Sequence, residues 1–262
     1  MANMTHETPT SETGILVVGH GTRDALGQAE FLQAVEQLRE SMPQLHVGGC
    51  FLELAEPNID AGVRALADKG IRHFIAAPLL LFAAGHAKRD IPDAISAAAS
   101  QYGDMQWQMA APLEDHPAVL NLSQRRCQSP LAASPFPIEE TLLIFIGRGS
   151  SDDEAVAAVH QFAASRADIS KYADYRTCFL AAAQPTLDEA IAWAIAQPQP
   201  GVIVQPHLLF HGRLIEDIRT RVEEARIQSA SREKAWQVTE HLGADQSITH
   251  ALFDRVLAME VD

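Results

Sequence analysis

The two halves of this 262-residue chain repeat each other. Cys50-Phe51-Leu52 recurs as Cys178-Phe179-Leu180, 128 residues further along the chain. Other matches at the same shift are Gly19 with Gly147, Pro57 with Pro185, and Pro78 with Pro206. This many matches at one offset indicate an internal duplication, and the period is far too long for a solenoid of short repeats. The chain is therefore predicted to fold into two lobes that share one fold.

Within each half, short apolar runs alternate with segments of helical periodicity. In the first half, residues 14–19, 45–54, 71–82 and 105–111 are expected to be strands, and a helix at about residues 116–127 is expected to complete the lobe. Such alternation is typical of the α/β class, and it predicts a mainly parallel four-stranded sheet sandwiched between helices in each lobe. The carboxyl ends of the strands of both lobes are expected to face one cleft.

The repeat and the composition together suggest boundaries. We expect a disordered tail over residues 1–13, a catalytic lobe over 14–128, a linker over 129–140, and a degenerate repeat lobe over 141–262. The linker is placed where proline and small residues are concentrated. The polar N-terminal residues lack the basic start and the apolar core of a signal peptide.

Charge and cysteine usage exclude several classes of function. The chain has 20 basic and 34 acidic residues, a net charge of −14, which disfavours a nucleic-acid surface and an anionic membrane surface. It has no apolar run long enough to span a bilayer. Its three cysteines show no paired spacing, so we expect a reduced, cytoplasmic setting. A monomer of two internal lobes is expected.

Three polar residues of the first half lie at the carboxyl ends of three different predicted strands. His20 lies between Gly19 and Gly21, Glu53 lies near the end of the second strand, and His86 follows the third. The carboxyl ends of parallel strands form the edge of the sheet where ligands bind. The matching positions of the second half are Arg148, Ala181 and, after a one-residue gap, Arg213. All three change type while the apolar framework persists, so the trio is predicted to be a site of the first lobe that the fold does not need.

The chemistry of this trio is open at this point. Two imidazoles and a carboxylate suit a first-row divalent metal, and the same groups could accept protons. The alternative is that they are polar residues that merely cap strand ends.

Three segments of the first half resemble the class II chelatases. They are Gly19-His20-Gly21 with the Thr-Arg-Asp that follows, Leu52 to Pro57, and Pro78 to His86. The resemblance is to the sirohydrochlorin cobaltochelatase/ferrochelatase family in its long, two-lobed form. It implies ATP-independent insertion of Co²⁺ or Fe²⁺ into a tetrapyrrole, for cobalamin or siroheme biosynthesis. By this resemblance, His20 and His86 are the catalytic histidines that bind the metal, and Glu53 is their acidic partner. The resemblance also implies that the metal is a substrate and that no tightly bound cofactor is needed.

Sirohydrochlorin carries many carboxylates, which an acidic protein must meet with local cations. Arg148, Arg213 and Arg23 are therefore predicted to bind the substrate, because arginine pairs well with carboxylates. Arg23, Lys88 and Arg89 lie beside the first-lobe turns, and for these three residues a solvated helix start is an equally good explanation. His207 and His211 could form an auxiliary metal site or donate hydrogen bonds to the substrate.

Two other functions are weighed against the chelatase. A non-enzymatic carrier of the metal or the tetrapyrrole could use the same pocket, although it has less need of proton acceptors. A histidine phosphatase is disfavoured, because Gly19 stands where an arginine is expected before the catalytic histidine.

Overall fold

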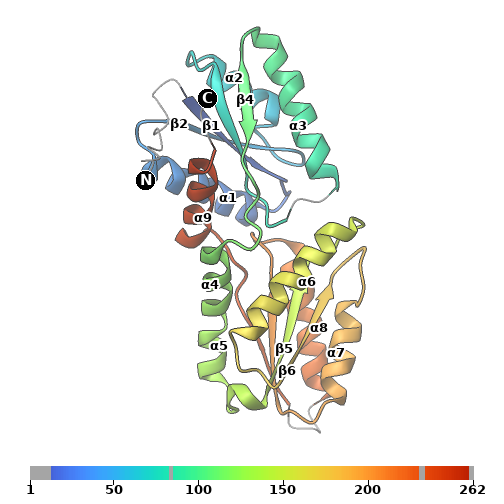
Figure 1. Ribbon diagram of the computed structural model, residues 1–262. Helices are drawn as coiled ribbons and strands as arrows, with labels where there is room; N and C mark the ends of the chain where they lie inside the picture. Colours follow the sequence, from blue (N-terminus) through green and yellow to red (C-terminus); the bar gives the residue numbers. More distant parts are fainter. Residues whose placement is uncertain (1–12, 83–84, 230–233, 260–262) are drawn as a thin grey trace. The chain divides into compact units, whose positions relative to one another are not determined.

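The structure, a computed structural model, describes residues 13–82, 85–229 and 234–259, except for the side chains of residues 85–87. These residues form two compact units (Figure 1). Lobe one contains the described residues up to Leu113 and those from Ala244 onward, and lobe two is Glu114–Gly243. Apart from Thr13, which begins the first strand, the predicted disordered tail lies outside the described residues.

Each lobe contains one parallel four-stranded sheet, as predicted. The strands of lobe one are β1 (Thr13–Gly19), β2 (His46–Phe51), β3 (His73–Pro78) and β4 (Gln106–Met109), in the order β2-β1-β3-β4. Those of lobe two are β5 (Thr141–Gly147), β6 (Asp174–Phe179), β7 (Gly201–Pro206) and β8 (Ala235–Val238), in the order β6-β5-β7-β8. Strands β1 and β5 are buried along their whole length, which explains why their side chains are apolar after the first threonine.

The register of the two sheets confirms the duplication. Val18 of β1 pairs with Cys50 on one side and Pro78 on the other. In lobe two, Ile146 pairs in the same way with Cys178 and Pro206, each 128 residues later. Both halves of the repeat therefore form the same sheet with the same neighbours.

Helices cover both faces of each sheet (Figure 1). They are α1 (Ala25–Ser41), α2 (Ile59–Ala67), α3 (Gly85–Ala99), α4 (Pro117–Arg126), α5 (Gln128–Ala133), α6 (Asp153–Asp168), α7 (Leu187–Ala196), α8 (Arg213–Gln228) and α9 (Gln246–Leu257). In lobe one, Leu16 and Val18 pack with α2 and α3 into one core. On the opposite face, Phe31 and Val35 of α1 lie over Gly19 at the end of β1 and Gly49 within β2.

The last helix of each repeat packs on the lobe of the other repeat, which corrects the predicted boundaries. We expected the helix near residues 116–127 to complete lobe one, but α4 belongs to lobe two and contacts α6. Its place in lobe one is taken by α9, which packs against α1. The exchange is reciprocal: Arg126 of α4 donates to the carbonyl of Leu242, and Arg255 of α9 donates to the carbonyl of Leu113 at 3.0 Å.

The predicted linker over residues 129–140 is largely helical. It contains most of α5 and a 3₁₀ turn, Ile138–Glu140, and both belong to lobe two. Leu131 packs against a small core of Cys127, Leu143 and Ile203. The prolines of this segment therefore begin and end short helices, and do not mark an extended connection.

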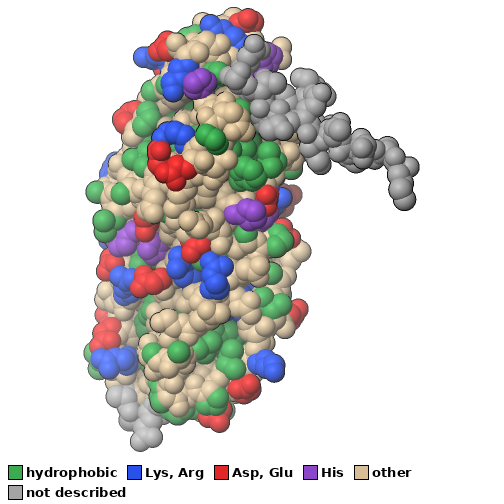
Figure 2. Space-filling view, turned by 90° about the vertical axis from the view of Figure 1, so that its left-hand side faces the viewer, with side chains coloured by type: hydrophobic (Ala, Val, Ile, Leu, Met, Phe, Trp, Pro, Cys, Tyr) green, Lys and Arg blue, Asp and Glu red, His purple; other side chains and the backbone are tan. Residues whose placement is uncertain are grey.

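Charged side chains of both signs lie on the surface (Figure 2). On the face drawn in Figure 2, acidic and basic side chains are interspersed, with no large field of one sign. None of the helices in the described part of the chain is long and apolar enough to cross a membrane.

Candidate functional site in lobe one

Two loops meet at the carboxyl edge of the lobe-one sheet. The loop after β1 carries His20, and the loop after β2 carries Glu53. The amide of Leu52 donates to the carbonyl of Gly19 at 2.8 Å, and that of Glu53 donates to the carbonyl of His20 at 3.0 Å. These two bonds extend the pairing of β1 with β2 beyond the strands and bring the two polar residues side by side.

Gly21 makes this close approach possible. Its φ is +98°, in the left-handed region, and a β-carbon at this position would lie 1.7 Å from the carbonyl oxygen of Glu53. Gly149 repeats both features in lobe two, with φ +90° and a distance of 1.8 Å to the oxygen of Ala181. The glycine after the functional position is therefore a requirement of the backbone in both lobes.

His20 and Glu53 lie together at the surface. His20 Nδ1 is 3.6 Å from Glu53 Oε1, and the side chains are 35% and 55% exposed. A carboxylate beside Nδ1 favours the tautomer in which Nε2 is the acceptor, the form that binds a metal or takes up a proton. The predicted proximity of these two residues is thus confirmed, and both are accessible to a ligand.

The structure locates the third predicted residue, His86, only by its backbone. It lies in the first turn of α3, after β3, which is the neighbour of β1 in the sheet. Its side chain lies outside the described residues. Among the side chains that are described, no group of three His, Cys, Asp or Glu residues could hold a metal. The participation of His86 stays a prediction.

Replacing Glu53 by alanine is expected to impair function and spare the fold. An ion pair this exposed contributes at most about 1 kcal/mol, and lobe two has Ala181 at the same position. We expect Glu53→Ala to slow turnover about 10- to 100-fold while thermal unfolding is unchanged. Circular dichroism melting and steady-state rates measure the two effects separately. A variant that unfolds would show that the glutamate is structural.

The predicted substrate-binding arginines are exposed side chains at comparable places. Arg148 follows β5 as His20 follows β1, and its carbonyl accepts from the amide of Ala181 at 3.1 Å. Arg213 is the first residue of α8, with its side chain 92% exposed and 4.0 Å from Asp217. Arg23 is exposed in the loop before α1. The structure thus leaves all three available to a solute.

His207 lies in the core of lobe two, away from any surface site. It is 2% exposed, and its ring packs against those of Phe145 and Phe162, with centroids 5.0 and 4.3 Å away. Burial lowers the pKa of His207 to about 3, so the imidazole is neutral at physiological pH. Leu79, equally buried, occupies the equivalent position in lobe one. His207 therefore acts as a core side chain, and neither role considered from the sequence fits it.

This burial makes lobe two sensitive to acid. The histidine binds a proton more readily in the unfolded chain, so stability is full above about pH 6.5 and falls as pH drops from there toward 3. Between pH 6.5 and 4.5 the loss attributable to His207 is about 2 kcal/mol. His207→Leu, which copies lobe one, is expected to remove this part of the pH dependence. Urea unfolding at both pH values tests it, and parallel losses in wild type and variant would contradict it.

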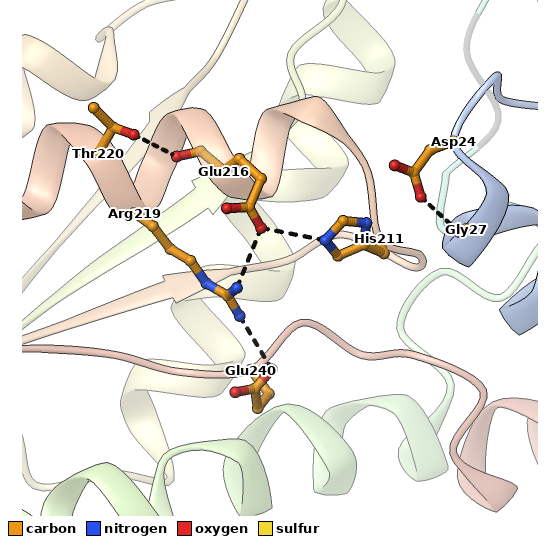
Figure 3. A network of polar contacts seen from close by, with 7 residues as sticks. All are labelled: Asp24, Gly27, His211, Glu216, Arg219, Thr220 and Glu240. Atoms are coloured by element: carbon orange, nitrogen blue, oxygen red, sulfur yellow. Dashed lines mark hydrogen bonds and ion pairs between the residues drawn. The ribbon is translucent and has the colours of Figure 1, made fainter.

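His211 belongs to a polar network that the sequence did not predict (Figure 3). Its Nε2 lies 3.2 Å from Glu216 Oε1, and Arg219 binds both Glu216, at 3.2 Å, and Glu240, at 3.4 Å. The ring of His241 is 9% exposed, and its centroid lies 6.1 Å from that of His211. Arg219 thus joins α8 to the segment after β8 at the carboxyl edge of lobe two. The sequence indicates this network only by the position of its residues after β7 and β8.

Comparison with known proteins shows the family. The model of the CbiX family matches residues 14–129 and again residues 142–259. This chain belongs to the CbiX family. The two matches also confirm the duplication, since each half of this CbiX-family chain fits the model separately.

Known proteins resemble this family member in sequence, and a solved structure also resembles it in fold. A sirohydrochlorin ferrochelatase of Priestia megaterium is 28% identical over 92% of this chain and 88% of its own length. A sirohydrochlorin cobaltochelatase of the same organism is 29% identical over 82% of this chain and 70% of its own length. Among solved structures, SirB from Bacillus subtilis with Fe³⁺ is 28% identical, covers 93% of this chain and 94% of that chain, and has a TM-score of 0.82.

Proposed function

We propose that this protein is a sirohydrochlorin chelatase, which inserts Co²⁺ or Fe²⁺ into the tetrapyrrole without ATP. One observation carries the proposal: His20 and Glu53 lie 3.6 Å apart at the accessible carboxyl edge of lobe one in a CbiX-family chain. Relatives that align with most of this chain are named for this activity with both metals. The pathway that it serves, cobalamin or siroheme, follows from the metal that it prefers.

The reaction gives these residues definite tasks. The metal ion replaces two N–H protons of the macrocycle, so insertion requires partial dehydration of the metal and acceptors for two protons. A neutral imidazole can bind the metal or accept a proton, and a carboxylate can balance the charge or pass a proton to solvent. We assign these tasks to His20, His86 and Glu53 together. Metal is bound here as a substrate and leaves with the product.

We further propose that Arg148, Arg213 and Arg23 bind the carboxylates of the substrate. Exposed guanidinium groups form paired hydrogen bonds with carboxylates. Since such contacts hold substrate and transition state alike, Arg148→Ala or Arg213→Ala is expected to raise KM about tenfold with a smaller change in kcat. Arg226→Ala is a matched control, because Arg226 is an exposed arginine of α8 that pairs with Glu223. A loss confined to kcat would assign the two arginines to the chemical step.

The direct test follows the absorbance spectrum of sirohydrochlorin under anaerobic conditions with Co²⁺ or Fe²⁺. We expect the spectrum of the metallated product to appear much faster with the protein than without it. The alternative is a carrier that binds the same molecules in the same place. A carrier would shift the spectrum only in proportion to the protein added. We also predict that the protein is cytoplasmic and monomeric.

A further inference from the structure

Leu54, directly after Glu53, is an exposed leucine in an uncommon backbone conformation. Its φ is +64°, and 48% of its surface is exposed. Few residues other than glycine, asparagine and aspartate adopt a positive φ, and a bulky side chain there is an outlier. Such outliers gather at functional sites, where the surrounding structure holds them in place.

The backbone around Leu54 explains how it is held. The amide of Ala55 donates to the carbonyl of Glu53 at 2.8 Å, which closes a three-residue turn centred on Leu54. On the other side, the amide of Glu53 donates to the carbonyl of His20. The turn that exposes the leucine is thus the turn that places the carboxylate beside the imidazole.

Lobe two shows that this turn does not require leucine. Ala182, at the equivalent position, has φ +55°, so an alanine satisfies the same backbone. Lobe two also lacks the imidazole and the carboxylate, having Arg148 and Ala181 in their places. The exposed aliphatic side chain therefore occurs in the lobe that has His20 and Glu53, and is reduced to a methyl group in the lobe that does not.

We propose that the side chain of Leu54 packs against the flat face of the tetrapyrrole and holds the ring beside Glu53 and His20. This inference rests on the proposed function and adds a residue that contacts the substrate. The net charge of −14 gives a carboxylate-rich substrate no general attraction, so its apolar ring face is a suitable source of binding free energy. Covering a half-exposed leucine removes apolar surface from water and adds dispersion contacts.

Three variants test the contact. Leu54→Asn keeps a side chain of similar size, makes it polar, and suits a positive φ better than leucine does, so folding is not at risk. It is expected to raise KM for sirohydrochlorin about three- to tenfold with kcat nearly unchanged. Leu54→Ala, which copies lobe two, is expected to give the same rise, and Leu54→Met is expected to restore the wild-type value. Leu32→Ala is the matched control, because Leu32 is also 48% exposed but lies well inside α1.

The outcomes separate this inference from the proposed function. Insertion by the wild type with unchanged KM in the Asn and Ala variants overturns the role of Leu54 and leaves the chelatase standing. An equal rise in the Leu32→Ala control also overturns it, because the effect would then not belong to this position. No insertion by the wild type overturns both. A rise in KM in the Asn and Ala variants, with rescue by methionine and unchanged melting, supports the contact.

Discussion

His20→Ala and His86→Ala are each expected to lower the rate of metal insertion more than about 100-fold while the chain stays folded. Each substitution removes an imidazole that would bind the metal or accept a proton. The fold should tolerate the loss of His20, since the side chain is 35% exposed and lobe two has an arginine in its place. Single-turnover rates and melting curves measure the two effects.

The matched controls for these variants are His46→Ala and His73→Ala. Both histidines are exposed and begin β2 and β3, so they lie at the amino edge of the same sheet. Their loss should leave insertion unchanged. If the His20 and His86 variants both insert Co²⁺ and Fe²⁺ at near-normal rates, the site lies elsewhere and the assignment is wrong.

Gly21→Ala is expected to have the largest effect on stability. The new β-carbon would lie 1.7 Å from the carbonyl oxygen of Glu53, a backbone atom that cannot rotate away, and φ would have to stay near +98°. We expect a loss of about 4 kcal/mol and a melting temperature lower by about 15 °C for lobe one. Insertion should fall as well, because the two loops that carry His20 and Glu53 must separate.

Gly70→Ala separates the two causes of this loss. Gly70 has a similar positive φ, +81°, but no atom lies within 4 Å of the position that its β-carbon would take. It should lose only about 1 kcal/mol, the cost of the backbone conformation. Equal losses in the two variants would mean that the close approach to Glu53 costs nothing and that our account of the loop contact is wrong.

The sequence predicted the sheets well because the repeat and the apolar runs both act locally. The strands β1 and β5 are buried on both faces, so their side chains are apolar without alternation, and the 128-residue offset links each strand to its partner. The exchange of α4 and α9 could not be predicted in this way. Both helices have an apolar face that suits either of two similar sheets, and periodicity does not say which sheet a helix covers.

The site was predictable to the extent that it depends on strand ends. His20 and Glu53 follow neighbouring parallel strands, and topology alone then brings them together. His207 shows the limit of this reasoning. It follows β7 in the same manner, yet its ring packs against Phe145 and Phe162, and the direction of a side chain at a strand end is decided by packing. Leu54 was missed because nothing in the sequence marks a positive φ at a leucine.

The most direct test of the central claim is the number of sirohydrochlorin molecules metallated per chain when tetrapyrrole and Co²⁺ are in large excess over protein. If lobe one catalyses insertion, each chain is expected to form many product molecules at a constant initial rate. His20→Ala is then expected to lose nearly all of that rate. Product that stops at one molecule per chain, or a rate that His20→Ala leaves intact, would contradict the account.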